Sequence, residues 1–150
     1  MRRLLPILLV VAALVPMGVM SASAAHGNGG MTRTVKVPDE DRFAPFAVTI
    51  HPGDAVRWYN GDSDDHTVVS DDAFNSAGHK GTDHLLPSGQ TFLLRFNHPG
   101  VFVYYCRFHA HLDDDHQPVA PGPDGGIQDP NGNFGTPMMG VITVLPGGDD

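Results

Sequence analysis

Residues 101–109 read Val-Phe-Val-Tyr-Tyr-Cys-Arg-Phe-His (VFVYYCRFH), and this stretch does most to define the fold. Apart from the cysteine, its first six residues are β-branched or aromatic, which is typical of a strand that packs in a core. We expect the strand to end at Cys106, so that the Cys106 thiol and the His109 imidazole leave the sheet close together. A thiolate and an imidazole at one end of a sheet suit a copper or zinc ion.

The rest of the chain alternates short apolar stretches with turns rich in glycine and proline. The predicted strands are residues 32–37, 43–50, 55–60, 66–69, 90–96 and 140–145, with turns at 51–54, 88–89 and 97–100. Pro45 favours an edge strand or a bulge for the second of these, and residues 71–86 are predicted to be mostly loop. This pattern, without a convincing amphipathic helix, indicates an all-β fold, a Greek-key sandwich or barrel.

Residues 1–25 have the layout of a secretory signal peptide. Arg2 and Arg3 precede an apolar segment, residues 4–20, and small residues follow at 21–25. This order is typical of a segment removed on export, and the alternative is an uncleaved membrane anchor. We therefore predict a signal peptide over residues 1–25, a single domain over residues 26–150, and an exported protein, periplasmic or extracellular.

The charge of the chain limits its partners. It has 9 basic and 17 acidic residues, and leaving out Arg2 and Arg3 lowers the basic count to 7 and gives a formal charge of −10. Such an acidic surface argues against binding to DNA, RNA or anionic lipid, and for solubility or a basic partner. We expect contact with a membrane to be peripheral at most.

Cys106 is the only cysteine of the chain, so it has no internal disulfide partner. An exported domain seldom keeps a thiol without a use, although a disulfide-linked dimer or simple burial are alternatives. Structural zinc sites use four nitrogen or sulfur ligands in paired motifs, which a lone cysteine with scattered histidines does not match. Two histidines, one cysteine and a weakly bound methionine form the set used by electron-transfer copper, and His66 with Met138 or Met139 completes it.

Four stretches of the chain resemble the plastocyanin-like cupredoxin (blue copper) family. They are FAPFAVTIHPGDAVRWYN (43–60), DDHTV (64–68), QTFLLRFNHPGVFVYYCRFH (90–109) and PMMGVITV (137–144). The resemblance covers residues 35–144 and implies a Greek-key sandwich of about eight strands. It also implies an electron carrier, not an enzyme, that works with a redox partner protein. Its cofactor would be one copper ion, Cu(I) or Cu(II), bound by His66, Cys106, His109 and Met138.

The sequence departs from this family between the second histidine and the methionine. His109 and Met138 are 29 residues apart, whereas the family separates these ligands by only a few residues. The intervening residues 112–137 are interpreted as a loop insertion. The axial position is therefore open to Met138, Met139, His111 or an aspartate, and a harder ligand than methionine would give a non-blue centre.

The insertion also suggests a second metal site. An acidic loop that binds only water is the alternative. An atypical site would favour a copper carrier, a copper chaperone or a small copper enzyme over an electron carrier. The residues that could bind this second metal are His111, Asp113, Asp115 and His116.

Two further expectations concern loops near the copper end of the domain. Leu112 and Phe134 are apolar residues with which the insertion can dock there, and docking would bring Asp113–Asp115 beside the metal. Asn60 precedes the loop that carries His66, and we expect it to tie that loop to the Cys106 end of the sheet.

Overall fold

The computed structural model describes residues 30–70, 81–122, 126–127 and 135–147. Residues 1–25, where a signal peptide is predicted, lie outside these ranges. In the described parts, no helix has the length and apolar character needed to span a membrane. The strands are β1 (Thr32–Val37), β2 (Ala47–Ile50), β3 (Ala55–Asn60), β4 (His66–Ser70), β5 (Thr82–Leu86), β6 (Thr91–Arg95), β7 (Gly100–Tyr105), β8 (His111–Leu112), β9 (Pro118–Val119) and β10 (Met139–Val144).

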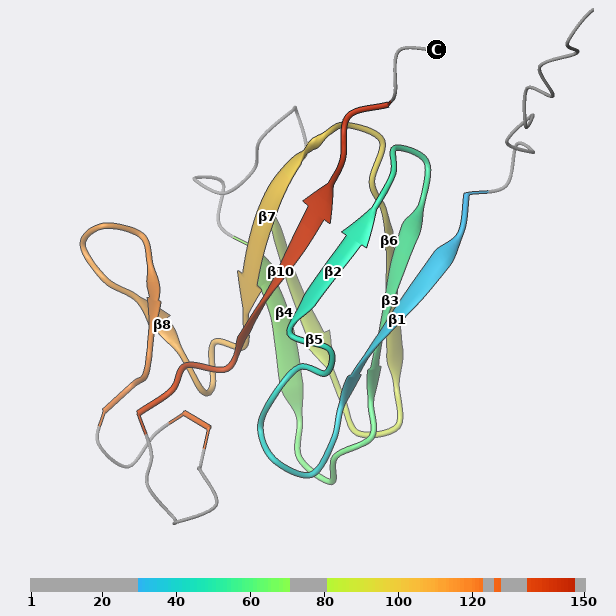
Figure 1. Cartoon of the computed structure of the whole chain (residues 1–150). Coiled ribbons are helices and arrows are strands. Elements are labelled where there is room, and N and C mark those ends of the chain that lie inside the picture. The colour runs from blue at the N-terminus through green and yellow to red at the C-terminus, as the bar shows by residue number, and fades with distance from the viewer. Residues whose placement is uncertain (1–29, 71–80, 123–125, 128–134, 148–150) are drawn as a thin grey trace, which may run out of the picture.

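Two sheets face each other and form a β-sandwich (Figure 1). The smaller sheet has the order β1-β3-β6, and the larger has the order β2-β10-β7-β4-β5. β1 pairs with β3, and β2 with β10, in parallel, while the other pairs in these sheets are antiparallel. The predicted all-β sandwich is confirmed.

Alternating burial along the strands explains why they pack in two layers. β1, β3 and β10 bury every second side chain over much of their length, as expected where one face of a sheet meets a core. Trp58 of β3 is 1% exposed and stacks on Phe92 of β6, and its ring meets Tyr104 of β7 edge-on. These contacts connect the two sheets through aromatic side chains.

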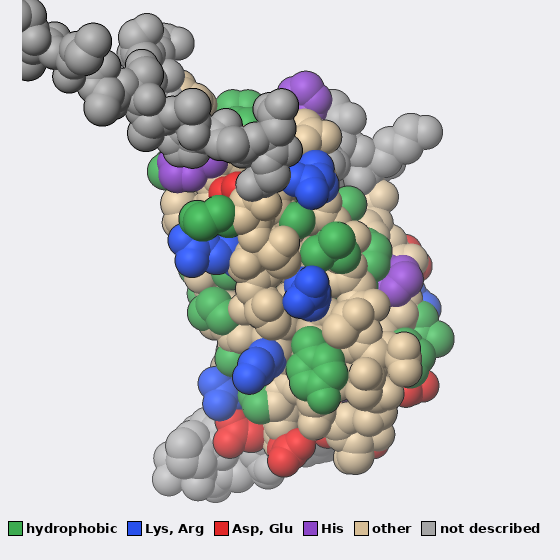
Figure 2. Space-filling model, turned by 90° about the vertical axis from the view of Figure 1, so that its right-hand side faces the viewer, with side chains coloured by type: hydrophobic (Ala, Val, Ile, Leu, Met, Phe, Trp, Pro, Cys, Tyr) green, Lys and Arg blue, Asp and Glu red, His purple; other side chains and the backbone are tan. Residues whose placement is uncertain are grey.

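The outer face of the smaller sheet is a mixed polar surface. It carries Lys36 of β1, Arg57 of β3 and Arg95 of β6, all exposed. Figure 2 shows Lys and Arg side chains spread over this side of the molecule, separated by polar and apolar ones. The cluster of cysteine and histidines lies elsewhere, at one end of the sandwich.

Two sequence predictions about strands need correction. Residues 82–86 were expected in a loop, but they form β5, which pairs with β4 along its length and buries Leu86. Pairing with β4 outweighs the polar composition of the segment. The strand predicted over residues 43–50 is split, because Ala44 makes an isolated bridge to Lys36 and β2 begins only at Ala47. A cis peptide bond precedes Pro45 at this break.

The prediction of an insertion without regular structure is wrong for part of its length. β8 and β9 pair as a small antiparallel hairpin, and Ile127 forms a bridge to Thr136. The turn of the hairpin is stabilised by the Asp113 carboxylate, which accepts hydrogen bonds from the backbone amides of Asp115 and Gln117 at 3.0 and 2.9 Å. A short acidic side chain that bonds to its own turn is the reason such residues favour turns.

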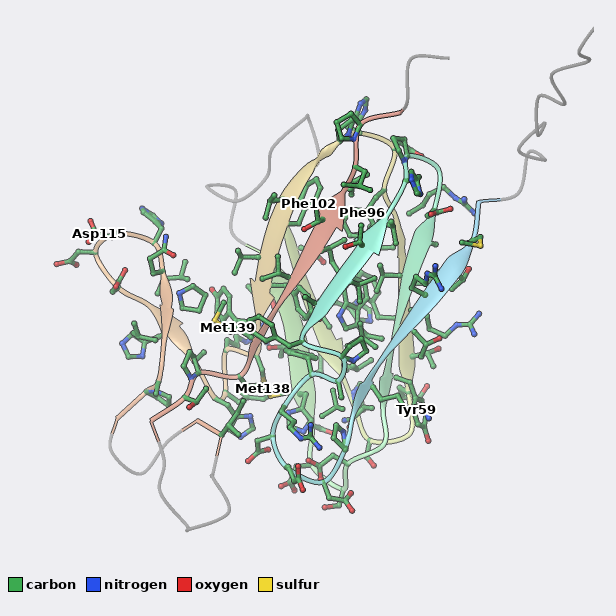
Figure 3. All side chains as sticks on the ribbon, in the orientation of Figure 1. Tyr59, Phe96, Phe102, Asp115, Met138 and Met139 are labelled. Atoms are coloured by element: carbon green, nitrogen blue, oxygen red, sulfur yellow. The ribbon has the colours of Figure 1, made fainter. Side chains whose placement is uncertain are left out.

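The insertion docks on the sandwich, but its acidic turn does not. Leu112 packs against a small buried cluster of Val69, Tyr105 and Ala110, and Ile127 packs against the main core. Docking through Leu112 is therefore confirmed, while Phe134 lies outside the described residues. Figure 3 shows Asp115 at the outer tip of the hairpin, so the expectation that this turn lies beside the metal is wrong.

Candidate metal centre

The register of β4 against β7 brings two parts of the chain together at one end of the sandwich. β7 pairs with β4 at Val69 and Tyr105, so the start of β4, with His66, lies beside the turn that follows β7. In that turn the amide of His109 donates a hydrogen bond of 3.0 Å to the carbonyl oxygen of Cys106. The turn folds the His109 ring back toward the sulfur that precedes it.

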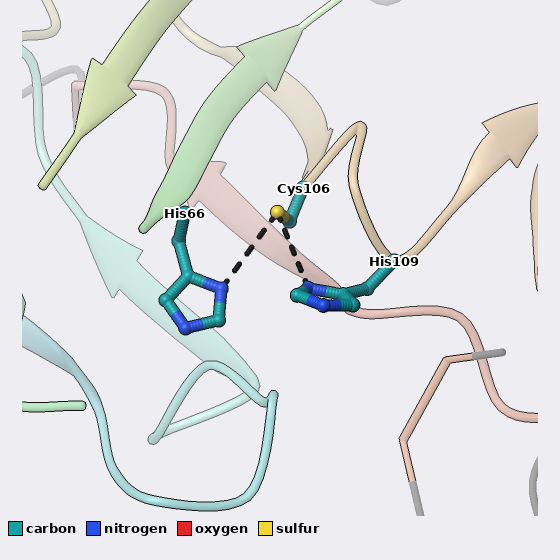
Figure 4. A group of neighbouring side chains, drawn as sticks. All are labelled: His66, Cys106 and His109. Atoms are coloured by element: carbon teal, nitrogen blue, oxygen red, sulfur yellow. Dashed lines mark hydrogen bonds between the residues drawn. The ribbon is translucent and has the colours of Figure 1, made fainter. Parts of the chain in front are cut away.

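Two imidazole nitrogens converge on the Cys106 sulfur (Figure 4). The Nδ1 atoms of His66 and His109 lie 3.8 and 3.6 Å from Sγ, and the three donor atoms lie within 4.8 Å of one another. Cys106 and His66 are fully buried, and the side chain of His109 is 24% exposed. The expected grouping of these three side chains is therefore present.

These separations fit a metal ion held between the three atoms. A metal lies about 2.0 Å from an imidazole nitrogen and about 2.3 Å from a thiolate sulfur. At angles of about 110–130° between the two bonds, nitrogen and sulfur are then about 3.5–3.9 Å apart. Two imidazoles and one thiolate are also the donors of trigonal copper sites, so the donor set and its spacing both fit copper.

Thr67 fixes the position of the sulfur. Its amide and its hydroxyl lie 3.4 and 3.7 Å from Sγ of Cys106, and both act as donors. The same hydroxyl accepts a hydrogen bond of 2.9 Å from the amide of Arg107. Because Thr67 follows His66 directly, one short segment supplies both the His66 ring and the hydrogen bonds to the Cys106 sulfur. Sequence reasoning did not identify this role, which depends on the pairing of strands.

Asn60 organises the loop before His66, though not as expected. Its side-chain amide donates to the carbonyl oxygens of Asp64 and Leu86 at 2.7 and 2.9 Å, and its oxygen accepts from the amide of Asp62 at 2.9 Å. Asn60 thus ties the loop to β5, and the tie to Cys106 comes from Thr67.

The two methionines of the PMMG motif lie in different environments. Met138 is fully buried in the same core cluster as Cys106, whereas Met139 is half-buried beside Tyr105 in the smaller cluster. The amide of Cys106 donates to the carbonyl oxygen of Met138 at 2.9 Å, and the Met138 amide donates to that of His109 at 3.2 Å. Figure 3 shows both methionines where β10 begins. Of the two, Met138 faces the core that contains the cysteine.

The other residues considered for metal binding lie apart from this cluster. His111 is exposed in β8, and His116 is exposed in the hairpin turn with a φ of 59°. Among the described residues, the groups whose donor atoms lie within reach of one ion are His66 with Cys106 and His109, and His66 with Asp41 and Asp62. A second metal in the insertion stays a prediction.

The environment favours the thiolate form of Cys106. Burial by itself raises the pKa of the thiol, but contacts with His109, His66 and Thr67 outweigh it and lower the pKa to about 5. The contact with Cys106 in turn raises the pKa of His109. A thiolate at neutral pH is the form that binds metals.

Two carboxylates face the outer nitrogens of the histidines, and the sequence did not point to them. Oδ2 of Asp62 is 3.2 Å from Nε2 of His66, and Oδ1 of Asp41 is 3.8 Å from the same atom and 3.6 Å from Nε2 of His109. Burial tends to raise the pKa of Asp62, but hydrogen bonds from His66 and from the loop backbone lower it overall. Both carboxylates thus lie behind the rings, on the side away from the Cys106 sulfur.

Comparison with families of known proteins matches residues 31–113 to "Copper binding proteins, plastocyanin/azurin family". The chloroplastic plastocyanin of Tetradesmus obliquus is 32% identical over 95 residues, which cover 60% of this chain and 62% of that protein. The chain thus spans less than two thirds of this relative. The plastocyanin of Scenedesmus fuscus is 29% identical over 72 residues, covering 45% of this chain and 74% of that protein.

Solved structures show the same fold. A reduced amicyanin with a proline-to-phenylalanine substitution aligns with a TM-score of 0.51 at 19% identity, covering 81% of this chain and 88% of that one. A Cu(I) amicyanin with a methionine-to-glutamine substitution aligns with a TM-score of 0.51 at 16% identity, covering 76% and 82%.

Proposed function

Because this chain belongs to the plastocyanin/azurin family of copper-binding proteins, we propose that it is an exported electron carrier with one copper ion. The observation that carries the proposal is the convergence of Nδ1 of His66, Nδ1 of His109 and Sγ of Cys106 at spacings that suit one metal. Copper bound there would supply a one-electron exchange between Cu(I) and Cu(II). Met138 is the proposed axial ligand, because it is buried in the core that contains Cys106.

The side chains of the site perform three tasks in this proposal. Thr67 and the strands hold the donor atoms in place, so that little moves when the charge of the site changes. The buried His66 and Met138 exclude water from the inner side. His109 is the ligand with an exposed edge, beside the exposed Phe108, and this edge is the proposed contact for a redox partner protein.

Export is supported by the apolar segment at residues 4–20 behind Arg2 and Arg3. The same segment is consistent with a periplasmic or extracellular location, where a lone thiol needs a metal or another partner. We expect the purified mature protein to lack this N-terminal segment. The intact mass of the mature protein measures this.

Absorption spectroscopy of the copper-loaded protein tests the proposal most directly. We expect a strong thiolate-to-copper band in the visible that disappears on reduction and is absent from Cys106→Ala. His111→Ala is the matched control, because this histidine is exposed in β8, and it should keep the band. A coloured Cys106→Ala protein, or a wild type that binds copper without a reversible redox change, would contradict an electron carrier.

A further inference from the structure

The two ring nitrogens of each histidine face in opposite directions. Nδ1 of His66 and of His109 faces the Cys106 sulfur, so Nε2 is the nitrogen left on the far side of each ring. Both Nε2 atoms face carboxylates, at 3.2 Å from Asp62 for His66 and at 3.6 Å from Asp41 for His109. A carboxylate behind a metal-binding imidazole orients the ring and strengthens the imidazole as a donor.

Asp41 is held in its place by the loop that carries it. Lys36 and Ala44 close this loop through two backbone hydrogen bonds of 2.8 Å, and Phe43 is buried edge-on against Tyr104. Asp41 itself has a φ of 46°, in the left-handed region that costs energy for most residues but that Asp and Asn tolerate. The side chain is 32% exposed, yet its Oδ1 lies within 3.8 Å of both rings.

Asp62 is fixed more tightly. It is 8% exposed, and its Oδ1 accepts a hydrogen bond of 2.6 Å from the amide of Ser63 while Oδ2 faces His66. Asn60 accepts a hydrogen bond from the amide of Asp62, which anchors the residue from behind. The carboxylate therefore has one oxygen for the loop and one for the ring.

We propose that Asp41 and Asp62 are positioning residues that hold the two histidine rings and bias a bound copper ion toward Cu(II). The inference rests on the proposed copper site and adds the two groups that make this site favour Cu(II) over Cu(I). A negative charge behind each ring stabilises the more positive ion, because the Coulomb energy of a nearby charge grows with the charge of the metal. Neutralising either carboxylate therefore favours Cu(I).

The test is the reduction potential of Asp41→Asn and Asp62→Asn, each in the full copper-loaded protein. Asn keeps the shape of Asp and tolerates a positive φ, so Asp41→Asn changes mainly the charge. Asp39→Asn is the matched control, because Asp39 lies exposed in the same loop two residues away. Affinities for Cu(II) and Cu(I) are measured separately by competition with a chelator, alongside the potential.

Each of the two variants should bind Cu(II) roughly tenfold more weakly. This is the lower end of the range of losses seen when groups that support metal ligands are replaced. If the Cu(I) affinity changes little, a tenfold change in the ratio of the Cu(II) and Cu(I) affinities raises the reduction potential by about 59 mV. The shift in Asp41→Asn should shrink at high salt, whereas that in the more buried Asp62→Asn should persist.

The possible outcomes separate this inference from the proposed function. A wild type without the thiolate-to-copper band overturns both. The inference alone is overturned if the wild type has the band but the reduction potentials of Asp41→Asn and Asp62→Asn shift no more than that of Asp39→Asn. Binding of a second copper that is lost in Asp41→Asn would also overturn it, because the carboxylate would then be a ligand.

Discussion

The backbone amide of Cys106 donates a hydrogen bond of 2.9 Å to the carbonyl oxygen of Met138, although the two residues are 32 residues apart in a chain with a long insertion. The bond continues the register of β7 and β10, in which Tyr105 pairs with Met139. The insertion therefore leaves the strand pairing next to the site intact, and it brings Met138 back beside the cysteine.

We expect Met138→Leu to raise the reduction potential and to keep the visible band nearly unchanged. The axial bond of such copper sites is long and weak, so removing the thioether changes the redox preference more than the thiolate bond. A shift on the order of 59 mV, a tenfold change in relative affinity, is measurable by spectroelectrochemistry.

Met139→Leu is the control for this change, because Met139 is half-buried beside Tyr105 in the smaller cluster. A similar-sized apolar replacement there should cost less than about 1.5 kcal/mol and leave the potential unchanged. A larger spectral change in Met139→Leu or in His111→Ala would show that the axial ligand is misassigned.

Gly140→Ala should destabilise the protein. A Cβ at this position would lie 2.5 Å from Cζ of Tyr104, closer than real contacts allow. The Tyr104 ring has little room to move, because it packs against Phe43 and Trp58. Overpacking of this kind costs about 1–3 kcal/mol, which chemical denaturation of the metal-free protein can measure. Gly147→Ala, with no atom within 4 Å of its added Cβ, should have no such effect.

The thiol of Cys106 should titrate near pH 5 in the metal-free protein. Its pKa lies below the ordinary value of 9.0, so the thiolate adds stability that is fully present above pH 9 and is lost as the pH falls through about 5. The ultraviolet absorption of the thiolate during a pH titration gives the midpoint, with Cys106→Ala as the blank.

Thr67→Val should move this midpoint upward, because it removes the hydroxyl that lies 3.7 Å from Sγ as a donor. Thr91→Val, at an exposed position of β6, is the control and should leave it unchanged. A wild-type midpoint between pH 8 and 9 would mean that the histidines do not stabilise the thiolate.

Replacing residues 113–137 by a short linker that keeps Met138 should lower stability and speed electron self-exchange. The replacement removes the contact of the half-buried Ile127 with the core and removes β9 from beside Leu112, which costs about 1–3 kcal/mol for the apolar surface involved. Denaturation and the self-exchange rate of the copper protein measure the two effects. If neither changes while copper stays bound, the insertion is no cover for the domain.

The charge of the hairpin turn is tested separately. Asp115 lies at the outer tip of the hairpin, so Asp114→Asn combined with Asp115→Asn should leave the potential unchanged. A rise in the reduction potential equal to the rise in Asp41→Asn would show that the hairpin closes over the site in solution.

Local pattern was enough to predict much of the fold and the core of the site. Alternating apolar residues and Gly/Pro turns report directly on which residues form strands and which face is buried, since both are properties of neighbouring residues. The composition of 101–109 predicted a strand there, which the structure ends at Tyr105, one residue before Cys106. The order of His66, Cys106 and His109 predicted the donor cluster that the structure contains.

Only the tertiary structure decided which groups surround that cluster. The register of β7 against β10 places Met138, not Met139, in the core with Cys106. Asp41 reaches both histidines from a loop 25 residues before His66, and Thr67 reaches the sulfur across two paired strands. These contacts join segments far apart in the chain, and local periodicity holds no information about how strands pair in space.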